Sequence, residues 1–150
     1  MTSTDDTETT AESAKAVVRQ YFAAFNDRDE GRLRELLRTD VVEQGVHREV
    51  HGVDDVVALL DAHFEPFPDF EGSGEAMIAE DDVVAVRYTA SGTHSGTYRD
   101  VPPTGHEVEW TGMAMYRIED DRIAEIWIEE NRLDLLEQLE LADPPAHFRI

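Results

Sequence analysis

The stretch from Glu107 to Glu130, "EVEWTGMAMYRIEDDRIAEIWIEE", decides the fold. Apolar and polar residues alternate on both sides of an acidic turn at 119–121, which predicts an antiparallel hairpin with strands at 107–118 and 122–130. A three-residue turn at 120–122 sets Arg117 opposite Glu125, a complementary cross-strand pair. The inner face then holds only apolar side chains: Trp110, Ala114, Tyr116, Ile118, Ala124, Ile126 and Ile128. A two-residue turn would mix Ala114 and Tyr116 with Glu125, Trp127 and Glu129, so the pattern favours the three-residue turn.

The same alternation extends upstream, where it predicts strands at 75–79 and 83–93 joined by a turn at 80–82. Before them the apolar period is helical. A first helix runs from a capping box at Thr9 and Glu12 to about Asn26, and a second, short helix ends near Asp40. A third helix follows Gly52, and the segment between the second and third has room for one ragged strand or a small hairpin. A last short helix carries leucines at 133, 136 and 139 until "ADPP" stops it.

Helices first and antiparallel strands afterwards predict an α+β domain in which one curved, mainly antiparallel sheet wraps around the N-terminal helices. A chain of 150 residues favours a single domain that buries roughly 70% of the surface of its unfolded chain. We expect residues 1–8 to be a disordered acidic tail, residues 9–140 to be the folded domain and residues 141–150 to be a C-terminal tail.

The charge balance is strongly acidic, with 34 Asp and Glu against 13 Lys and Arg and a formal net charge of -21. Nucleic acid and anionic membranes should repel such a protein. Lys15 is the only lysine, and a lysine-poor, acid-rich surface suits a cytosol of very high salt. An ordinary acidic protein from a GC-rich genome is the alternative.

The chain has no cysteine, which excludes disulfides, thiolate catalysis and cysteine-ligated metals. The start "MTSTDDTETT" has neither the basic nor the apolar segment of a signal peptide, and no apolar run approaches the roughly 20 residues of a membrane span. We therefore expect a cytoplasmic protein.

Four segments carry a family resemblance: "YFAAFNDRD" from Tyr21, "PFPDF" from Pro66, "SGTHSGTYRDVPPTG" from Ser91 and "RIAEIWIEENRLDLLEQLE" from Arg122. In order and spacing they resemble the SnoaL-like polyketide cyclases of the nuclear transport factor 2-like superfamily, over about residues 11–140. The resemblance implies a cone-shaped barrel with a deep apolar pocket, no cofactor, and often a homodimer formed through the sheet. It also implies that the "PPTG" loop is a stiff connection at the barrel rim.

The cyclase mechanism does not carry over with the fold. In the cyclases an aspartate on the last strand acts as acid and base, helped by a Gln-x-His pair on the preceding strand. The resemblance aligns the Gln and His with Gly112 and Ala114, and the Asp with Ile128. All three polar groups are therefore missing from this chain.

Two glutamates could replace that relay. Glu130 lies beyond Ile128 on the same face, opposite Gly112, and Glu43 follows the second helix where the cyclases place a polar pocket residue. A carboxylate at the edge of an apolar pocket has the raised pKa that a general base needs. The alternative is that both are surface glutamates in a chain rich in glutamate.

The remaining candidates are aromatic residues, histidines and methionines. Tyr21, Phe25, Trp110 and Tyr116 either line a ligand cavity or fill it. His47, His51, His63 and His94 lack the spacing on one helix that zinc hydrolases use, so we expect no metal, and we expect His94 to form a structural hydrogen bond.

The outer face of the hairpin holds Met113, Met115 and Trp127, an apolar patch that predicts a homodimer.

The sequence leads to three hypotheses about function. The first is an enzyme that binds a small hydrophobic molecule and carries out cofactor-free proton transfer, such as cyclisation, isomerisation, hydration or dehydration. The second is a non-catalytic ligand-binding or sensing protein on the same fold, and the third is a structural dimerising domain with a filled core.

Overall fold

One six-stranded sheet, in the order β2-β1-β6-β5-β4-β3, forms the body of the protein in a computed structural model that describes residues 4–45 and 48–148. The strands are β1 (Leu37–Gln44), β2 (Glu49–His51), β3 (Glu71–Glu80), β4 (Val83–Thr93), β5 (Glu107–Glu119) and β6 (Arg122–Glu130). The helices are α1 (Thr4–Asn26), α2 (Glu30–Leu36), α3 (Val53–Asp61) and α4 (Arg132–Gln138), with short 3-10 turns η1 (Ala62–Phe64) and η2 (Ala146–Phe148).

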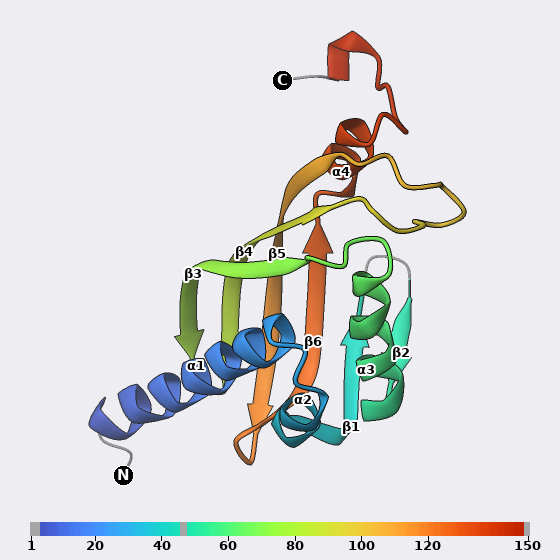
Figure 1. Cartoon of the computed structure of the whole chain (residues 1–150). Helices are drawn as coiled ribbons and strands as arrows, with labels where there is room; N and C mark the ends of the chain where they lie inside the picture. The colour runs from blue at the N-terminus through green and yellow to red at the C-terminus, as the bar shows by residue number, and fades with distance from the viewer. Residues whose placement is uncertain (1–3, 46–47, 149–150) are drawn as a thin grey trace.

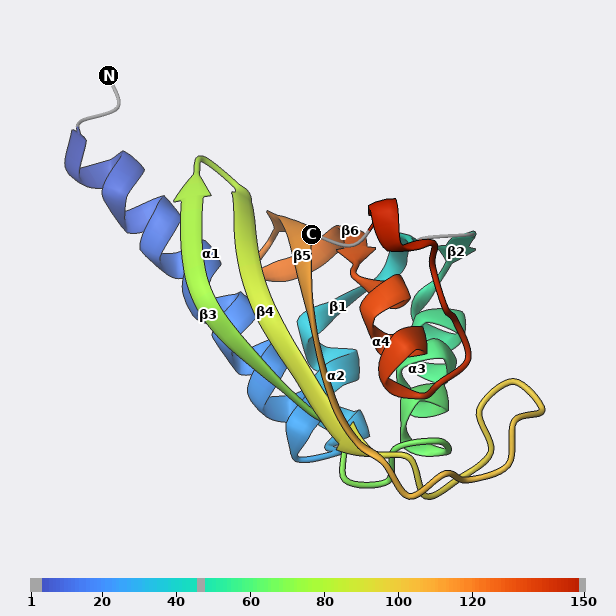
Figure 2. The same ribbon diagram turned by 90° about the horizontal axis from the view of Figure 1, so that it is seen from above.

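The sheet is curved, and the first helices lie against its inner face. All neighbouring strands are antiparallel except β1 and β6, which run parallel. Figures 1 and 2 show α1 crossing the sheet near β3 and β4, while α2 and α3 lie beside β1 at the other end. The sheet does not close on itself. This is the predicted α+β architecture, and the core lies between α1, α3 and the sheet.

The register of the β5–β6 hairpin is as predicted, but the turn is not. Glu119 pairs with Arg122, so the turn has two residues, Asp120 and Asp121, both with positive φ. An irregularity next to the turn then shifts the register by one residue and restores the Arg117–Glu125 pair. The predicted three-residue turn is therefore wrong, because a bulge supplies the extra residue within the strand.

Two element boundaries also differ from the prediction. The second helix ends at Leu36, and the chain continues as β1 rather than remaining helical to Asp40. Non-local pairing of β1 with β6 decides this boundary, and a helical period within the segment cannot reveal it. Helix α1 begins at Thr4 instead of near Thr9, because no helix-breaking residue separates the two positions.

Strand β3 begins at Glu71, earlier than the predicted residue 75. The side chain of Asn26, at the end of α1, forms hydrogen bonds with the backbone of this first part of the strand. The Asn26 side chain donates to the carbonyl of Gly72 at 2.8 Å and accepts from its amide at 2.9 Å. Gly72 and Gly74 interrupt the apolar alternation, which hides this half of the strand from a sequence pattern.

The "PPTG" segment belongs to a long β4–β5 connection that projects from the end of the sheet (Figure 2). Buried His94 anchors its base: its Nδ1 lies 2.9 Å from the Thr104 hydroxyl and 3.3 Å from the Thr104 amide. This is the structural role that the sequence predicts for His94. Asp69 in "PFPDF" fixes the same end of β4 by accepting from the Thr93 amide and hydroxyl at 2.7 and 2.8 Å.

No helix within residues 4–45 and 48–148 has the length and apolarity needed to cross a membrane.

Candidate active site

A cavity of about 80 Å³ lies between the first helices and the sheet. We call it the inner chamber. Helix α1 contributes Tyr21, Phe22 and Phe25 at helical spacing, and the rings of Tyr21 and Tyr116 meet edge to face at 5.6 Å. The complete lining is Tyr21, Phe22, Phe25, Glu43, Leu60, His63, Phe70, Gly72, Tyr88, Tyr116, Ile128 and Glu130. The inner chamber is thus mostly aromatic, with two carboxylates in its wall.

Tyr88, Gly112 and Glu130 form one row across three strands. Gly112 pairs with Tyr88 on one side and with Glu130 on the other. The Tyr88 hydroxyl passes over the glycine and donates to Glu130 Oε1 at 2.8 Å. A Cβ at position 112 would lie 2.4 Å from the Tyr88 ring, so only glycine leaves room for this hydrogen bond.

Glu43 is the most deeply buried carboxylate of this site, with 2% of its surface exposed. Strand β1 directs it inward together with fully buried Val41, while β1 is held between β2 and β6. Its Oε1 has no hydrogen-bond partner within the described residues. Burial, helped by the nearby negative charge of Glu130, raises the pKa of Glu43 to about 7, although the positive charge of Arg48 opposes this.

The tyrosines of the inner chamber stay protonated at any physiological pH. Burial raises the pKa of Tyr21, Tyr88 and Tyr116, and the charges of neighbouring residues, including Glu43, raise it further. Each therefore remains a neutral hydroxyl that can donate a hydrogen bond.

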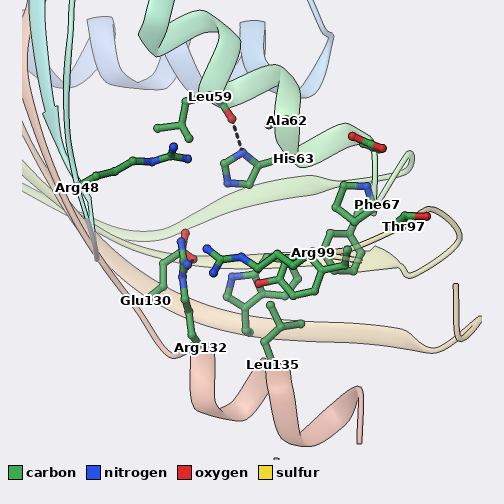
Figure 3. A pocket seen from close by; sticks show the side chains of 14 residues that line it. Arg48, Leu59, Ala62, His63, Phe67, Thr97, Arg99, Glu130, Arg132 and Leu135 are labelled. Carbon is green, nitrogen blue, oxygen red and sulfur yellow. Dashed lines mark hydrogen bonds and ion pairs between the residues drawn. The ribbon is translucent and has the colours of Figure 1, made fainter. Parts of the chain in front are cut away.

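Two further cavities adjoin the inner chamber. The middle cavity, of about 70 Å³, shares Glu43, His63, Ile128 and Glu130 with it. The vestibule, of about 220 Å³, shares His63 and Glu130 with both and is walled by the β4–β5 connection and α4 (Figure 3). His63 lines all three cavities, and its ring donates from Nδ1 to the Leu59 carbonyl at 3.0 Å. The three cavities are thus neighbours, and Glu43 lines the inner chamber and the middle cavity.

The two predicted candidates for the catalytic base, Glu43 and Glu130, line the same cavities. Both carboxylates line the inner chamber and the middle cavity, although the sequence places them on strands far apart in the chain. Glu130 accepts from Tyr88 and lies 3.7 Å from Arg132, so it has partners that Glu43 Oε1 lacks. Their catalytic role remains a prediction.

Four of the predicted pocket residues line the inner chamber: Tyr21, Phe25, Tyr116 and Ile128. Trp110 lies in the vestibule wall instead, while Gly112 and Ala114 lie in the sheet without being part of the lining.

The predicted dimer residues lie on the outer face of the sheet. Met113 and Met115 are 59% and 46% exposed there, and Trp127 is half-buried. His47 lies outside the described residues.

Sequence reasoning missed Tyr88 and three arginines, Arg48, Arg99 and Arg132. Tyr88 could have been found from Gly112, because a glycine inside a strand often marks a close approach by a neighbouring side chain. Arg48 and Arg99 come from two connections and Arg132 from the start of α4, and no local pattern brings the three together.

The fold and the cavity define an α+β cone with an apolar, carboxylate-bearing interior. The family model for SnoaL-like polyketide cyclases matches residues 15–139, and the chain belongs to this family. No match is found among curated proteins.

Solved structures with the same fold include AclR, a candidate hydroxylase from Streptomyces galilaeus. It is 30% identical, with a TM-score of 0.81 over 91% of each chain. IdmH, a candidate polyketide cyclase from Streptomyces antibioticus, is 29% identical, with a TM-score of 0.76 over 85% of this chain and 98% of its own. A SnoaL-like polyketide cyclase candidate from Jannaschia sp. CCS1, at 22% identity and a TM-score of 0.81 over 90% of this chain and 96% of its own, shares the fold.

Proposed function

We propose that the protein binds a small hydrophobic, carbonyl-containing molecule in the inner chamber and catalyses a cofactor-free proton transfer on it, with Glu43 as the acid/base group. The observation that carries the proposal is the buried Glu43 carboxyl, with an unpartnered oxygen and a pKa of about 7, in the wall of an aromatic cavity. A general base works best when its pKa lies near the operating pH.

The chemistry follows from the groups in the wall. The Glu43 carboxylate removes a proton from the carbon beside the carbonyl, and negative charge develops on the carbonyl oxygen. Tyr21 and Tyr116 supply neutral hydroxyls in the same wall for that charge. Protonated Glu43 returns the proton to another carbon of the enolate, which gives isomerisation. In cyclisation the enolate carbon attacks a second carbonyl of the substrate, and Glu43 protonates the resulting alkoxide. In dehydration the enolate expels a hydroxyl from the neighbouring carbon, and Glu43 protonates it to water. Glu130, tied to Tyr88 and Arg132, holds the wall in place.

The departure from the cyclase relay agrees with this assignment. Gly112, Ala114 and Ile128 stand where the family's polar residues are implied, so the proton-transfer group must come from elsewhere in the wall. The relatives near 30% identity are described as a candidate hydroxylase and a candidate polyketide cyclase, which fits a small organic substrate for this chain as well.

Deuterium exchange into simple ketones tests the proposal with probes in place of the natural substrate. Cyclohexanone, 2-cyclohexenone and 1-indanone are incubated with the protein in D₂O, and exchange beside the carbonyl is followed by NMR. We expect exchange above background that falls by roughly 100-fold or more in Glu43→Gln. Glu129→Gln, an exposed neighbour of Glu130 on the opposite face of β6, is the matched control and should exchange normally. Exchange that survives Glu43→Gln would remove Glu43 from the chemistry.

Ligand binding without turnover is the second candidate function, and the small size of the inner chamber favours it for a compact ligand. In that case Glu43 Oε1 accepts a hydrogen bond from a ligand hydroxyl or amide. Binding of these ketones without catalysed exchange in the wild type would support this second function.

A further inference from the structure

Three arginines from three different segments gather at the middle cavity. Arg48 comes from the β1–β2 connection, Arg99 from the β4–β5 connection and Arg132 from the first turn of α4. All three line both the middle cavity and the vestibule. Figure 3 shows their side chains extending toward the same space beside Glu130.

Two of these guanidinium groups form no ion pair within the described residues, although the positive charge of Arg48 acts on the Glu43 carboxyl. Arg132 Nε lies 3.7 Å from Glu130 Oε2. Within residues 10–45 and 48–148, Arg48 and Arg99 take part in no ion pair and in no hydrogen bond between side chains. The guanidinium carbon of Arg99 lies over the Tyr98 ring, 6.0 Å from the ring centroid. An arginine left without a partner beside a cavity is available to a ligand.

The surplus of acid in the whole chain makes this arrangement unusual. With 34 acidic and 13 basic residues, most arginines can find a carboxylate, as Arg34 does with Asp54 at 2.6 Å. The middle cavity has more positive than negative charge. Its lining holds three arginines and two carboxylates, Glu43 and Glu130, so its net charge is one positive charge, or two when Glu43 is protonated. Glu65 adds one carboxylate to the vestibule, whose lining does not include Glu43.

A buried donor in the vestibule lacks a partner as well. Trp110 is 3% exposed, and its Nε1 has no hydrogen-bond partner within the described residues. An indole N–H can only donate, so a ligand that satisfies it must bring an acceptor oxygen. The residues that line the vestibule therefore include a tryptophan whose N–H has no partner and two arginines that form no ion pair within the described residues.

We propose that Arg48, Arg99 and Arg132 form an anion subsite, and that the natural ligand is a hydrophobic carboxylic acid whose ring enters the inner chamber while its carboxylate stays at the arginines. The assignment rests on the proposed function, because it names the substrate class for the same cavity. A carboxylate suits the planar guanidinium fork, and a surplus of one positive charge in the middle cavity matches a monoanion better than a doubly charged phosphate.

A set of three ligands with the same benzyl group tests this subsite: phenylacetate, phenylacetamide and benzyl phosphate, each titrated by calorimetry at one fixed ionic strength. We expect phenylacetate to bind roughly tenfold or more tightly than the neutral amide, as charged hydrogen bonds to arginine imply. We expect benzyl phosphate to bind no more tightly than phenylacetate. Tighter binding of the phosphate would overturn the carboxylate assignment.

The decisive variant is Arg48→Gln with Arg99→Gln, which should remove the preference for the acid over the amide. The control is Arg87→Gln with Arg122→Gln, which makes the same change in net charge at exposed positions outside the cavities. The control should keep the preference. Equal binding of acid and amide by the wild type, or the same loss in both double variants, would overturn the subsite. Each single substitution should give an intermediate preference, which checks that a loss is not due to misfolding.

The two proposals can fail separately. Deuterium exchange into neutral ketones reports on Glu43 and needs no anion subsite. An acid preference without ketone exchange would leave the subsite standing and remove the catalysis, whereas exchange without an acid preference would do the reverse.

Discussion

At the scale of single residues, the buried Glu43 carboxyl links the stability of the folded state to the proposed acid/base chemistry. A carboxyl that is 2% exposed and has an unpartnered oxygen makes the folded state less stable when it ionises. Most buried polar groups have hydrogen bonds, and those that do not often belong to functional sites. Stability and acid/base chemistry are therefore opposed at this one side chain.

The raised pKa of Glu43 predicts how the free energy of unfolding depends on pH. The pKa is raised from 4.5 to about 7 in the folded protein, so the folded state holds this proton more tightly than the unfolded state. The contribution of protonated Glu43 to the free energy of unfolding is therefore fully present below about pH 4.5, and it is lost as the pH rises through about 7. Glu43→Gln abolishes this titration. We expect the variant to gain about 3 kcal/mol on wild type between pH 4.5 and 8, measured by denaturant unfolding.

Comparison with Glu129→Gln isolates the effect from the many other carboxylates. Glu129 is exposed on the same strand as Glu130, and its substitution changes the net charge equally. Its stability difference from wild type should be small at every pH. A Glu43→Gln difference that does not change between pH 4.5 and 8 would mean that Glu43 titrates normally.

At the scale of elements, the alternation of apolar residues predicted most strands. It did not predict the element boundaries that depend on pairing with distant segments. Strands β4 and β6 have the predicted bounds, although a bulge next to the turn interrupts the alternation of β6. The end of α2 at Leu36 and the early start of β3 depend on pairing with β6 and with Asn26. Glu43 and Glu130 could be named as candidates from position. Tyr88 follows from cross-strand register, and the arginines follow from the paths of two connections and the start of α4.

The β4–β5 connection is fixed to the rest of the protein by a close backbone contact at Gly96. A Cβ at this position would lie 1.8 Å from the Glu65 carbonyl oxygen, and the Gly96 amide donates to the Pro66 carbonyl at 3.2 Å. We expect Gly96→Ala to destabilise the protein by about 1–3 kcal/mol and to weaken phenylacetate binding, since the connection carries Arg99. Thermal unfolding and calorimetry measure the two effects.

Gly31→Ala is the matched control for that substitution. Gly31 lies in α2, where the nearest atom to an added Cβ is 3.7 Å away, so alanine should leave stability unchanged or raise it slightly. Unchanged stability and binding in Gly96→Ala would show that the connection can move away from Glu65 without cost.

At the scale of the whole molecule, a net charge of -21 predicts dependence on salt. Carboxylates that repel one another weaken the compact state, and counterions screen the repulsion. We expect the melting temperature to rise steeply between low and molar potassium chloride at neutral pH. Near pH 4.4, the isoelectric point of the sequence, the same salt series should give a much smaller rise. A flat response at neutral pH would leave the high-salt interpretation of the composition without support.

The outer face of the sheet carries the second whole-molecule prediction, a homodimer. Cross-strand pairing places Ile78, Ala85, Met115 and Trp127 in one row over four strands, with Met113 beside it. Ile78 is 72% exposed and Met113 59%, so the row forms an apolar patch on an otherwise acidic protein. Helix α4 does not cover it: Gln138 of this helix bonds the Glu109 backbone, far along β5 from Met115.

A two-fold interface would set this row against its own copy, with Arg117 and Glu125 at the rim already paired within each chain at 2.9 Å. Light scattering in high salt tests this, because screening removes repulsion between two strongly acidic subunits. We expect a dimeric wild type and a folded, monomeric Met115→Glu and Trp127→Glu double variant. Leu133→Glu with Leu141→Glu replaces exposed leucines elsewhere and should stay dimeric. A monomeric wild type would show that the row remains exposed to solvent, and its methionines would then need another explanation.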